Sequence, residues 1–183
     1  FLKPLITPCE ATPCHTTKLL GNKPRSRYLQ EGDISAIRDC IVMAAPTSRW
    51  FQLTICGPKI YLSDTNHVWK INATCEKTLR KTVMIGCWKR HSFTIYDSTM
   101  VNGEDVTNIS LRHRLARIKR AVLGFSLCKI ITLYDICTTM ILNLIENHGG
   151  IMFAYLKTGY DSQRLIYRSM DQIGLLFHPV EVQ

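Results

Sequence analysis

Hydrophobic and polar residues alternate with a period of two in several segments of the chain. The segments that show this pattern are 49–56, 68–75, 82–88 and 91–96. In the first of them Phe51, Leu53 and Ile55 alternate with polar neighbours, and the last two are either separate strands or one long strand bent at Gly86. Alternation of this kind is typical of strands with one buried face. It predicts an antiparallel sheet whose other face contacts solvent.

Hydrophobic residues recur at helical spacing after this β region. Residues 109–125 carry one hydrophobic stripe, formed by Leu111, Leu115, Ile118, Val122 and Phe125. Residues 132–147 show a second such pattern, and Gly149-Gly150 supplies a stop signal directly after it. Stripes of this width indicate helices that pack one face on a core. The two segments therefore predict two amphipathic helices.

Shorter elements are predicted on either side of these regions. Residues 33–46 indicate a short helix, because Asp33 is a favourable N-cap and isoleucines recur along one face. Near the end of the chain, the apolar runs 151–156 and 164–169 are separated by a polar stretch containing Gly159. This arrangement predicts a β-hairpin.

The order of these elements determines the predicted fold class. Strands and helices fall in runs without βαβ alternation, which indicates an α+β fold. A chain of 183 residues suits one domain. We therefore predict a single domain at residues 31–183, with an antiparallel sheet packed against two or three helices.

The first thirty residues differ from the rest in composition. They contain Pro4, Pro8, Pro13 and Pro24 among threonines and lysines, with Glu10 as their one acid. We interpret residues 1–30 as an extended Pro/Thr-rich arm that orders against a partner. The expected partner is a second copy of the chain, so a homo-oligomer is predicted.

Positive charge is the strongest chemical signal in the sequence. The formal net charge is +9, and no acid occurs from Val106 to Tyr134. The stripe of the helix at 109–125 leaves a basic set on its remaining surface and flank, namely Arg112, His113, Arg114, Arg117, Lys119 and Arg120. Like charges at helical spacing cost roughly 0.2–0.5 kcal/mol per pair. The helix is therefore predicted to bind an anion, the alternative being an ordinary solvated face.

The identity of the anion is left open between RNA or ribonucleoprotein and an anionic phospholipid surface. Arginine outnumbers lysine in the basic stretch, and its planar guanidinium suits phosphate. No aromatic residue lies between Arg112 and Arg120, which indicates contact with a phosphate backbone and no reading of bases.

Enzymatic and metal-dependent functions have little support in the sequence. It contains no P-loop, no nucleophile elbow, no zinc-protease motif and no dinucleotide fingerprint, so no enzyme activity, cofactor or small-molecule substrate is expected. Cys9 and Cys14, next to His15, have the spacing of one zinc knuckle, but Cys87 and His91 do not supply a matching second pair, so no metal is predicted.

The setting of the eight cysteines indicates whether the protein is found in a reducing or an oxidising compartment. Six of them lie in apolar or alternating runs, where a reduced cysteine behaves as a small buried residue. This favours a location in the cytoplasm or within a virion, and no segment is long and apolar enough to span a membrane. Glycosylation acceptors at Asn72 and Asn108 keep a secreted, disulfide-bonded glycoprotein as an alternative.

Size, charge and the arm together suggest a non-enzymatic assembly protein. This profile is similar to that of small basic structural proteins of viruses, such as matrix proteins between a ribonucleoprotein and a membrane. The first alternative is a small RNA-binding protein without sequence preference, such as a ribosome component or a silencing suppressor.

Overall fold

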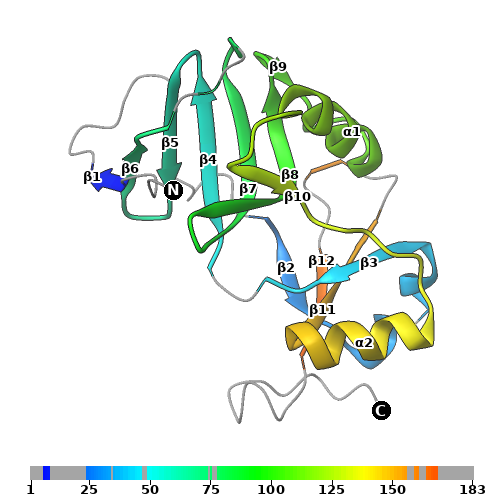
Figure 1. Cartoon of the computed structure of the whole chain (residues 1–183). Helices are drawn as coiled ribbons and strands as arrows, with labels where there is room; N and C mark the ends of the chain where they lie inside the picture. Colours follow the sequence, from blue (N-terminus) through cyan, green and yellow to red (C-terminus); the bar gives the residue numbers. More distant parts are fainter. Residues whose placement is uncertain are drawn as a thin grey trace.

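The computed structural model describes residues 6–8, 24–33, 35–46, 49–73, 75, 78–155, 159–160 and 164–168. These residues form two β-sheets and two α-helices, and Figure 1 shows the larger sheet above the smaller one. The predicted α+β class and the mainly antiparallel pairing are confirmed. The prediction of one sheet is wrong, because strands from residues 26–44 and 150–168 form a second sheet.

The larger sheet has the strand order β1-β6-β5-β4-β7-β8-β10, and β9 pairs with β8. Its strands are β1 (Ile6–Pro8), β4 (Phe51–Cys56), β5 (Lys59–Ser63), β6 (Val68–Ile71), β7 (Thr82–Lys89), β8 (Ser92–Val101), β9 (Glu104–Asp105) and β10 (Cys128–Ile130). All neighbours are antiparallel except β10 and β8, which are parallel. The predicted strands at 49–56 and 68–75 correspond to β4 and β6, whereas β5 was not predicted.

Strand β4 is buried on both faces. Leu53 and Ile55 are fully buried, and so are the alternating polar residues Gln52 and Thr54. The expectation of a solvated face is therefore wrong for this central strand. Gln52 Nε2 donates to Thr54 Oγ1 at 3.4 Å, so these polar side chains bond to each other within the interior.

Strands β7 and β8 form a hairpin with an irregularity in its middle. The register shifts between Ile85 and Gly86, which is typical of a β-bulge. A Cβ atom on Gly86 would lie 1.8 Å from the carbonyl oxygen of Thr94, so only glycine fits this close approach of two backbones. The structure confirms two separate strands. The extra residue of the bulge is Tyr96 on β8, opposite the step from Ile85 to Gly86 on β7.

The smaller sheet has the order β2-β12-β11-β3. Its strands are β2 (Ser26–Tyr28), β3 (Cys40–Ala44), β11 (Gly150–Tyr155) and β12 (Arg164–Arg168). Strands β11 and β12 pair antiparallel, which confirms the predicted hairpin, while β2 joins β12 in parallel. Residues of this sheet such as Met43 and Met152 belong to the same hydrophobic cluster as Leu53 and Ile85 of the larger sheet.

The helix predicted at 33–46 does not form. The structure has two short 3₁₀ turns, η2 (Glu31–Asp33) and η3 (Ala36–Asp39), followed by β3. The apolar run after residue 39 pairs with β11 and is buried at every position of β3, so a buried strand replaces an amphipathic helix. Asp33 accepts hydrogen bonds from both terminal nitrogens of Arg27, at 2.6 and 2.5 Å, and this contact lowers the pKa of the carboxyl group.

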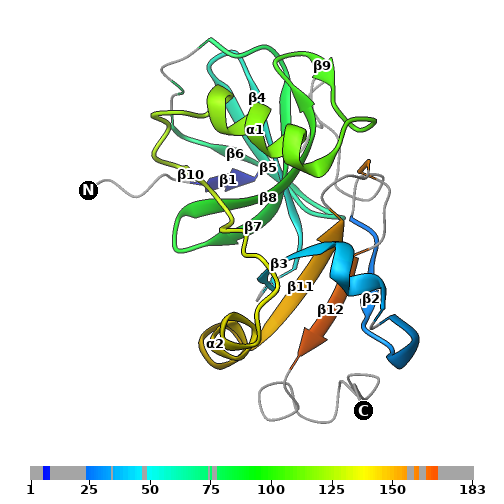
Figure 2. The ribbon, with the colours of Figure 1, turned by 90° about the vertical axis from the view of Figure 1, so that its right-hand side faces the viewer.

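Two α-helices occur in the described chain, α1 (Leu111–Ala121) and α2 (Thr138–His148). Figure 2 shows α1 against the larger sheet and α2 beside β3 and β11 of the smaller one. The second helix begins later than predicted, and Gly149 ends it in the left-handed conformation at φ 75°. Neither helix, at 11 residues each, has the length and apolar character to span a bilayer.

Parts of the predicted arm at 1–30 lie within the two sheets. Strand β1 pairs with β6 at the edge of the larger sheet, and β2 pairs with β12 at the edge of the smaller one. Leu29 is 4% exposed and packs in the cluster beneath α2. The division at residue 30, and the role of the arm in self-association, stay predictions.

Candidate nucleic-acid interface

Helix α1 is positioned by its cap and by its hydrophobic stripe. Ser110 is extended at the N-cap and its hydroxyl accepts a hydrogen bond from the backbone N–H of His113 at 3.4 Å. Leu111, Leu115 and Ile118 are buried and belong to the cluster that contains the larger sheet. The predicted stripe is therefore confirmed, and it fixes which side of the helix faces solvent.

The solvent side of α1 carries five of the six predicted site residues. Those exposed are Arg112, His113, Arg117, Lys119 and Arg120. Arg117 donates to Glu104 Oε2 at 2.8 Å, so strand β9 supplies an acid that the helix itself lacks. Both partners are largely exposed, and such a pair contributes little stability. Arg117 and Arg120 also line a surface depression of about 320 Å³.

The sixth residue, Arg114, does not belong to this surface. It is 1% exposed, which corrects its assignment to the anion-binding face. Its Nε donates to Asp97 Oδ1 at 2.7 Å and its Nη2 to Asp97 Oδ2 at 2.9 Å. Its Nη1 donates to the carbonyl oxygen of Ile109 at 2.6 Å. Arg114 lies at the border of the hydrophobic stripe. Its side chain is buried because it pairs with the buried carboxylate of Asp97 on β8.

Asp97 also joins the two sheets. Arg164, at the start of β12, donates from Nη2 to Asp97 Oδ2, and both residues are buried. The ring of Tyr160 lies 5.8 Å from the guanidinium carbon of Arg114 and 5.3 Å from that of Arg164. Such distances are typical of cation–π contacts. These four residues link helix α1, strand β8 and strand β12, and no sequence motif indicated them.

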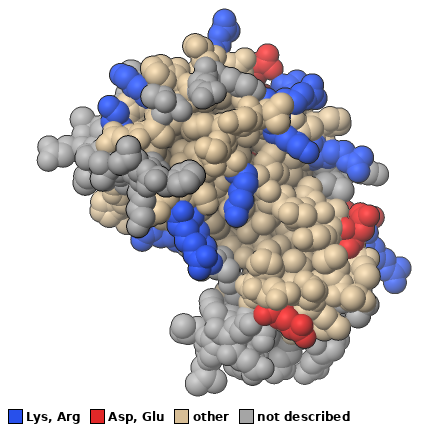
Figure 3. All heavy atoms as spheres, in the orientation of Figure 1, with Lys and Arg blue, Asp and Glu red and all other residues tan. Residues whose placement is uncertain are grey.

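The net charge is confined to one part of the chain. Residues 49–131, which include β4 to β10 and α1, contain fourteen Lys and Arg against five Asp and Glu, a net charge of +9. The remaining residues contain nine of each and are neutral. Figure 3 shows this asymmetry as basic side chains over the larger sheet and α1, with few around α2. The folded chain therefore has one strongly basic half.

A groove opens between the end of α1 and strand β10. It has a volume of about 680 Å³ and is lined by Lys119, Val122, Leu123, Gly124, Phe125, Ser126, Cys128, Ile130, Ile131 and Thr132. Leu123, one of the residues that line the groove, is 67% exposed. Burial raises the pKa of the Cys128 thiol in this groove to about 12.

The cysteines and candidate metal ligands show no cluster in the part of the chain that the structure describes. Six cysteines there are free, and no group of three or more His, Cys, Asp or Glu side chains is arranged to hold a metal ion. Cys9, Cys14 and His15 lie outside the described residues. Cys137 differs from the expected buried cysteines, because it is exposed and the backbone N–H groups of Met140 and Thr139 lower its pKa.

Comparison with known proteins relates the fold to a nucleic-acid enzyme. No protein-family model matches the chain, and no curated protein matches its sequence. The fold is similar to that of a solved structure described as "DNA binding with a minimal scaffold: Structure-function analysis of Lig E DNA ligases", with a TM-score of 0.54. The match covers 80% of this chain and 69% of that chain, at 12% sequence identity. At this identity the likeness concerns the fold alone.

Proposed function

We propose that this chain folds as one domain that binds nucleic acid through the phosphate backbone, without catalysing a reaction. The observation that carries the proposal is the confinement of the whole net charge to residues 49–131, with five exposed basic side chains on α1. Proteins release condensed counterions when Lys and Arg contact phosphates, and this supplies most of the affinity for nucleic acid without sequence preference.

Two further observations support this proposal. Residues of both sheets share one hydrophobic cluster, which favours one domain with a fixed basic half. The structural neighbour is described as binding DNA, so a related fold serves that purpose in another protein. The related hypothesis of a matrix-like assembly protein, with a phospholipid surface as the anion, rests on charge and size and has no further support in the fold.

The proposal is tested by removing charge from α1. Replacing Arg112 and Arg120 with glutamine keeps helix propensity nearly constant and leaves the hydrophobic stripe intact. The matched control is Arg25→Gln with Arg38→Gln, which removes two exposed charges from the smaller-sheet half. Binding of a labelled duplex is measured by fluorescence anisotropy across a range of salt concentrations.

The expected result is weaker binding for the α1 variant and unchanged binding for the control. The slope of log Kobs against log salt should fall by about two for the α1 variant, because two phosphate contacts are lost. Equal binding by parent and both variants would contradict the proposal. Binding of anionic vesicles with the same dependence on α1, but of no nucleic acid, would assign the basic half to a membrane surface.

A further inference from the structure

The β7–β8 hairpin ends in a strained basic turn. Lys89 pairs with Ser92, and the two residues between them, Arg90 and His91, have φ of 49° and 63°. Two-residue turns of this kind normally use Asn and Gly, because left-handed conformations are unfavourable for other residues. Lys89, Arg90 and His91 are all exposed. The tip therefore presents basic side chains at a position where less strained residues would form the same turn.

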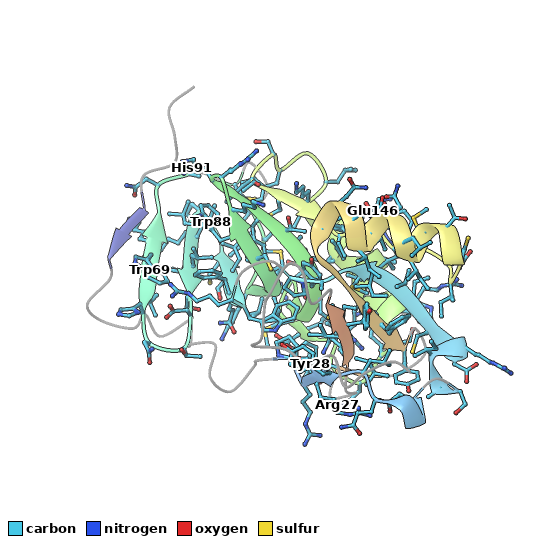
Figure 4. All side chains as sticks on the ribbon, turned by 90° about the horizontal axis from the view of Figure 1, so that it is seen from below. Arg27, Tyr28, Trp69, Trp88, His91 and Glu146 are labelled. Atoms are coloured by element: carbon cyan, nitrogen blue, oxygen red, sulfur yellow. The ribbon has the colours of Figure 1, made fainter. Side chains whose placement is uncertain are left out.

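An aromatic side chain lies directly beside this tip. Trp88 is half-buried against the core, and Figure 4 shows it next to His91 and well apart from Glu146 on α2. Phe93 of β8 lies opposite Trp88 of β7 in the register of the sheet, and it also lies opposite Cys128 of β10. Residues directly opposite each other share a face of the sheet. Trp88 therefore lies on the same face as Cys128, two strand spacings or about 10 Å away.

The same face contains the groove at the end of α1. Cys128 lines that groove together with Phe125 and the exposed Leu123, and Lys119 stands on the α1 side. The tip and Trp88 lie at the end of β7, the groove lies beside β10, and the fully buried Phe93 of β8 separates them. Basic residues accompany both parts, namely Lys89 and Arg90 at the tip and Lys119 at the groove. We call these two parts together the hairpin–groove face.

Alternation of cationic and aromatic side chains is the pattern that binds single strands. Basic residues contact the backbone, and unpaired bases stack on aromatic rings without sequence preference. A duplex hides its base faces, so it can use the cations of such a surface but not its apolar part. We infer that the hairpin–groove face binds single-stranded nucleic acid, with phosphates near Lys119, Lys89 and Arg90 and bases against Trp88 and the groove. This inference rests on the proposed function and specifies its substrate.

The charge part of the inference is tested with a pair of double variants. Lys89→Gln with Arg90→Gln removes two charges from the tip. Lys59→Gln with Lys70→Gln removes two exposed charges from β5 and β6, at the opposite end of the sheet. Both are measured for binding of a labelled single strand of about 16 nucleotides and of the corresponding duplex. The tip variant should bind the single strand about tenfold more weakly, whereas the control should bind it like the parent.

The apolar part is tested with Leu123→Ser and Trp88→Phe. Leu123 is 67% exposed, so serine there leaves the core intact. It should weaken single-strand binding several-fold and leave duplex binding unchanged, because only an unpaired base can pack on the apolar side chain that is removed. A single strand should quench part of the fluorescence of the three tryptophans, and Trp88→Phe should remove that part.

The outcomes separate this inference from the proposed function. If the parent binds neither single strands nor duplex, the proposed function is wrong. If it binds both but the tip and groove variants bind the single strand like the parent, the inference is wrong and α1 alone carries binding. A third outcome is that Leu123→Ser weakens the binding of a glutamate-rich peptide and leaves the binding of the single strand unchanged. The groove would then bind an acidic protein partner, and the inference would be overturned.

Discussion

The structure gives Arg114 a different role from the one that the sequence predicts. Its neighbours Arg112 and Arg117 are exposed on α1, while Arg114 is fully buried and forms a bidentate ion pair with Asp97. A charge in the interior is tolerated only when it is paired and hydrogen-bonded. Asp97 is shared between Arg114 and Arg164, so one carboxylate compensates two guanidinium groups.

We expect Asp97→Asn to destabilise the protein strongly. The amide keeps the shape of the side chain but removes the negative charge, which leaves two buried guanidinium groups uncompensated. Breaking a buried ion pair in this way costs about 3–5 kcal/mol. The measurement is the free energy of unfolding in urea, with far-ultraviolet circular dichroism as the probe.

Glu104→Gln is the matched control for Asp97→Asn. It makes the same chemical change in the exposed pair with Arg117, where both side chains are substantially solvated. The expected loss there is at most about 1 kcal/mol. A loss of similar size in the two variants would mean that the buried cluster does not depend on its carboxylate.

The burial of Arg114 could not be predicted from the sequence for a physical reason. The spacing of Leu111, Leu115 and Ile118 correctly predicts the buried side of α1, because amphipathic periodicity is local. The partner Asp97 lies 17 residues before Arg114 and on a strand, and Arg164 lies 67 residues after Asp97. Only the fold brings these three residues together.

At the scale of elements, the β7–β8 hairpin depends on Gly86. The bulge at this position lets two backbones approach so closely that a Cβ atom would lie 1.8 Å from the carbonyl oxygen of Thr94. Glycine in a strand normally weakens it, so its presence here marks a special geometry. The sequence left open whether residues 82–96 form two strands or one long strand bent at Gly86.

Gly86→Ala should therefore destabilise the protein by about 3 kcal/mol or more, because the added methyl group meets backbone and not a flexible side chain. The expected fall in Tm is roughly 6–12 °C. Gly32→Ala is the control, since no atom lies within 4 Å of the position of its Cβ. Differential scanning calorimetry of the two variants measures the difference, and equal melting temperatures would show that the strands separate at the bulge without cost.

Other elements show where periodicity misleads. Residues 40–44 have the hydrophobic content of a buried helix face, yet they form β3 because both sides of this strand are covered. A short, fully apolar run has no period that distinguishes strand from helix. The hairpin predicted from the runs 151–156 and 164–169 is confirmed as β11 and β12, because two strand-forming runs on either side of a polar stretch containing Gly159 are a local signal.

At the scale of the whole molecule, the two sheets share a core but differ in charge. Residues 49–131, which include β4 to β10 and α1, carry a net charge of +9, while the smaller sheet and α2 belong to a neutral remainder. Composition alone cannot show this, because it averages over the chain. The boundary between arm and folded body is likewise not visible in the composition. Strands β1 and β2 both lie within residues 1–30, yet each is an edge strand of one of the two sheets.

Two truncations test where the folded body begins. Removal of residues 1–23 deletes β1, a three-residue edge strand, and leaves β6 paired with β5. Removal of residues 1–29 also deletes β2 and Leu29, whose backbone N–H donates to Ile166 at 2.8 Å. The shorter truncation should fold with little loss of stability. The longer one should lose several kcal/mol, because burial of Leu29 alone contributes roughly 1.5–3 kcal/mol.

Urea denaturation and light scattering on both truncated chains measure stability and oligomeric state together. Loss of self-association in the shorter truncation, with stability retained, is the result expected if residues 1–23 bind a neighbouring copy. A longer truncation as stable as the shorter one would place the start of the body near residue 30, because β2 and Leu29 would then contribute nothing to it. An unfolded shorter truncation would instead make β1 an integral strand, since the larger sheet would not persist without its pairing to β6.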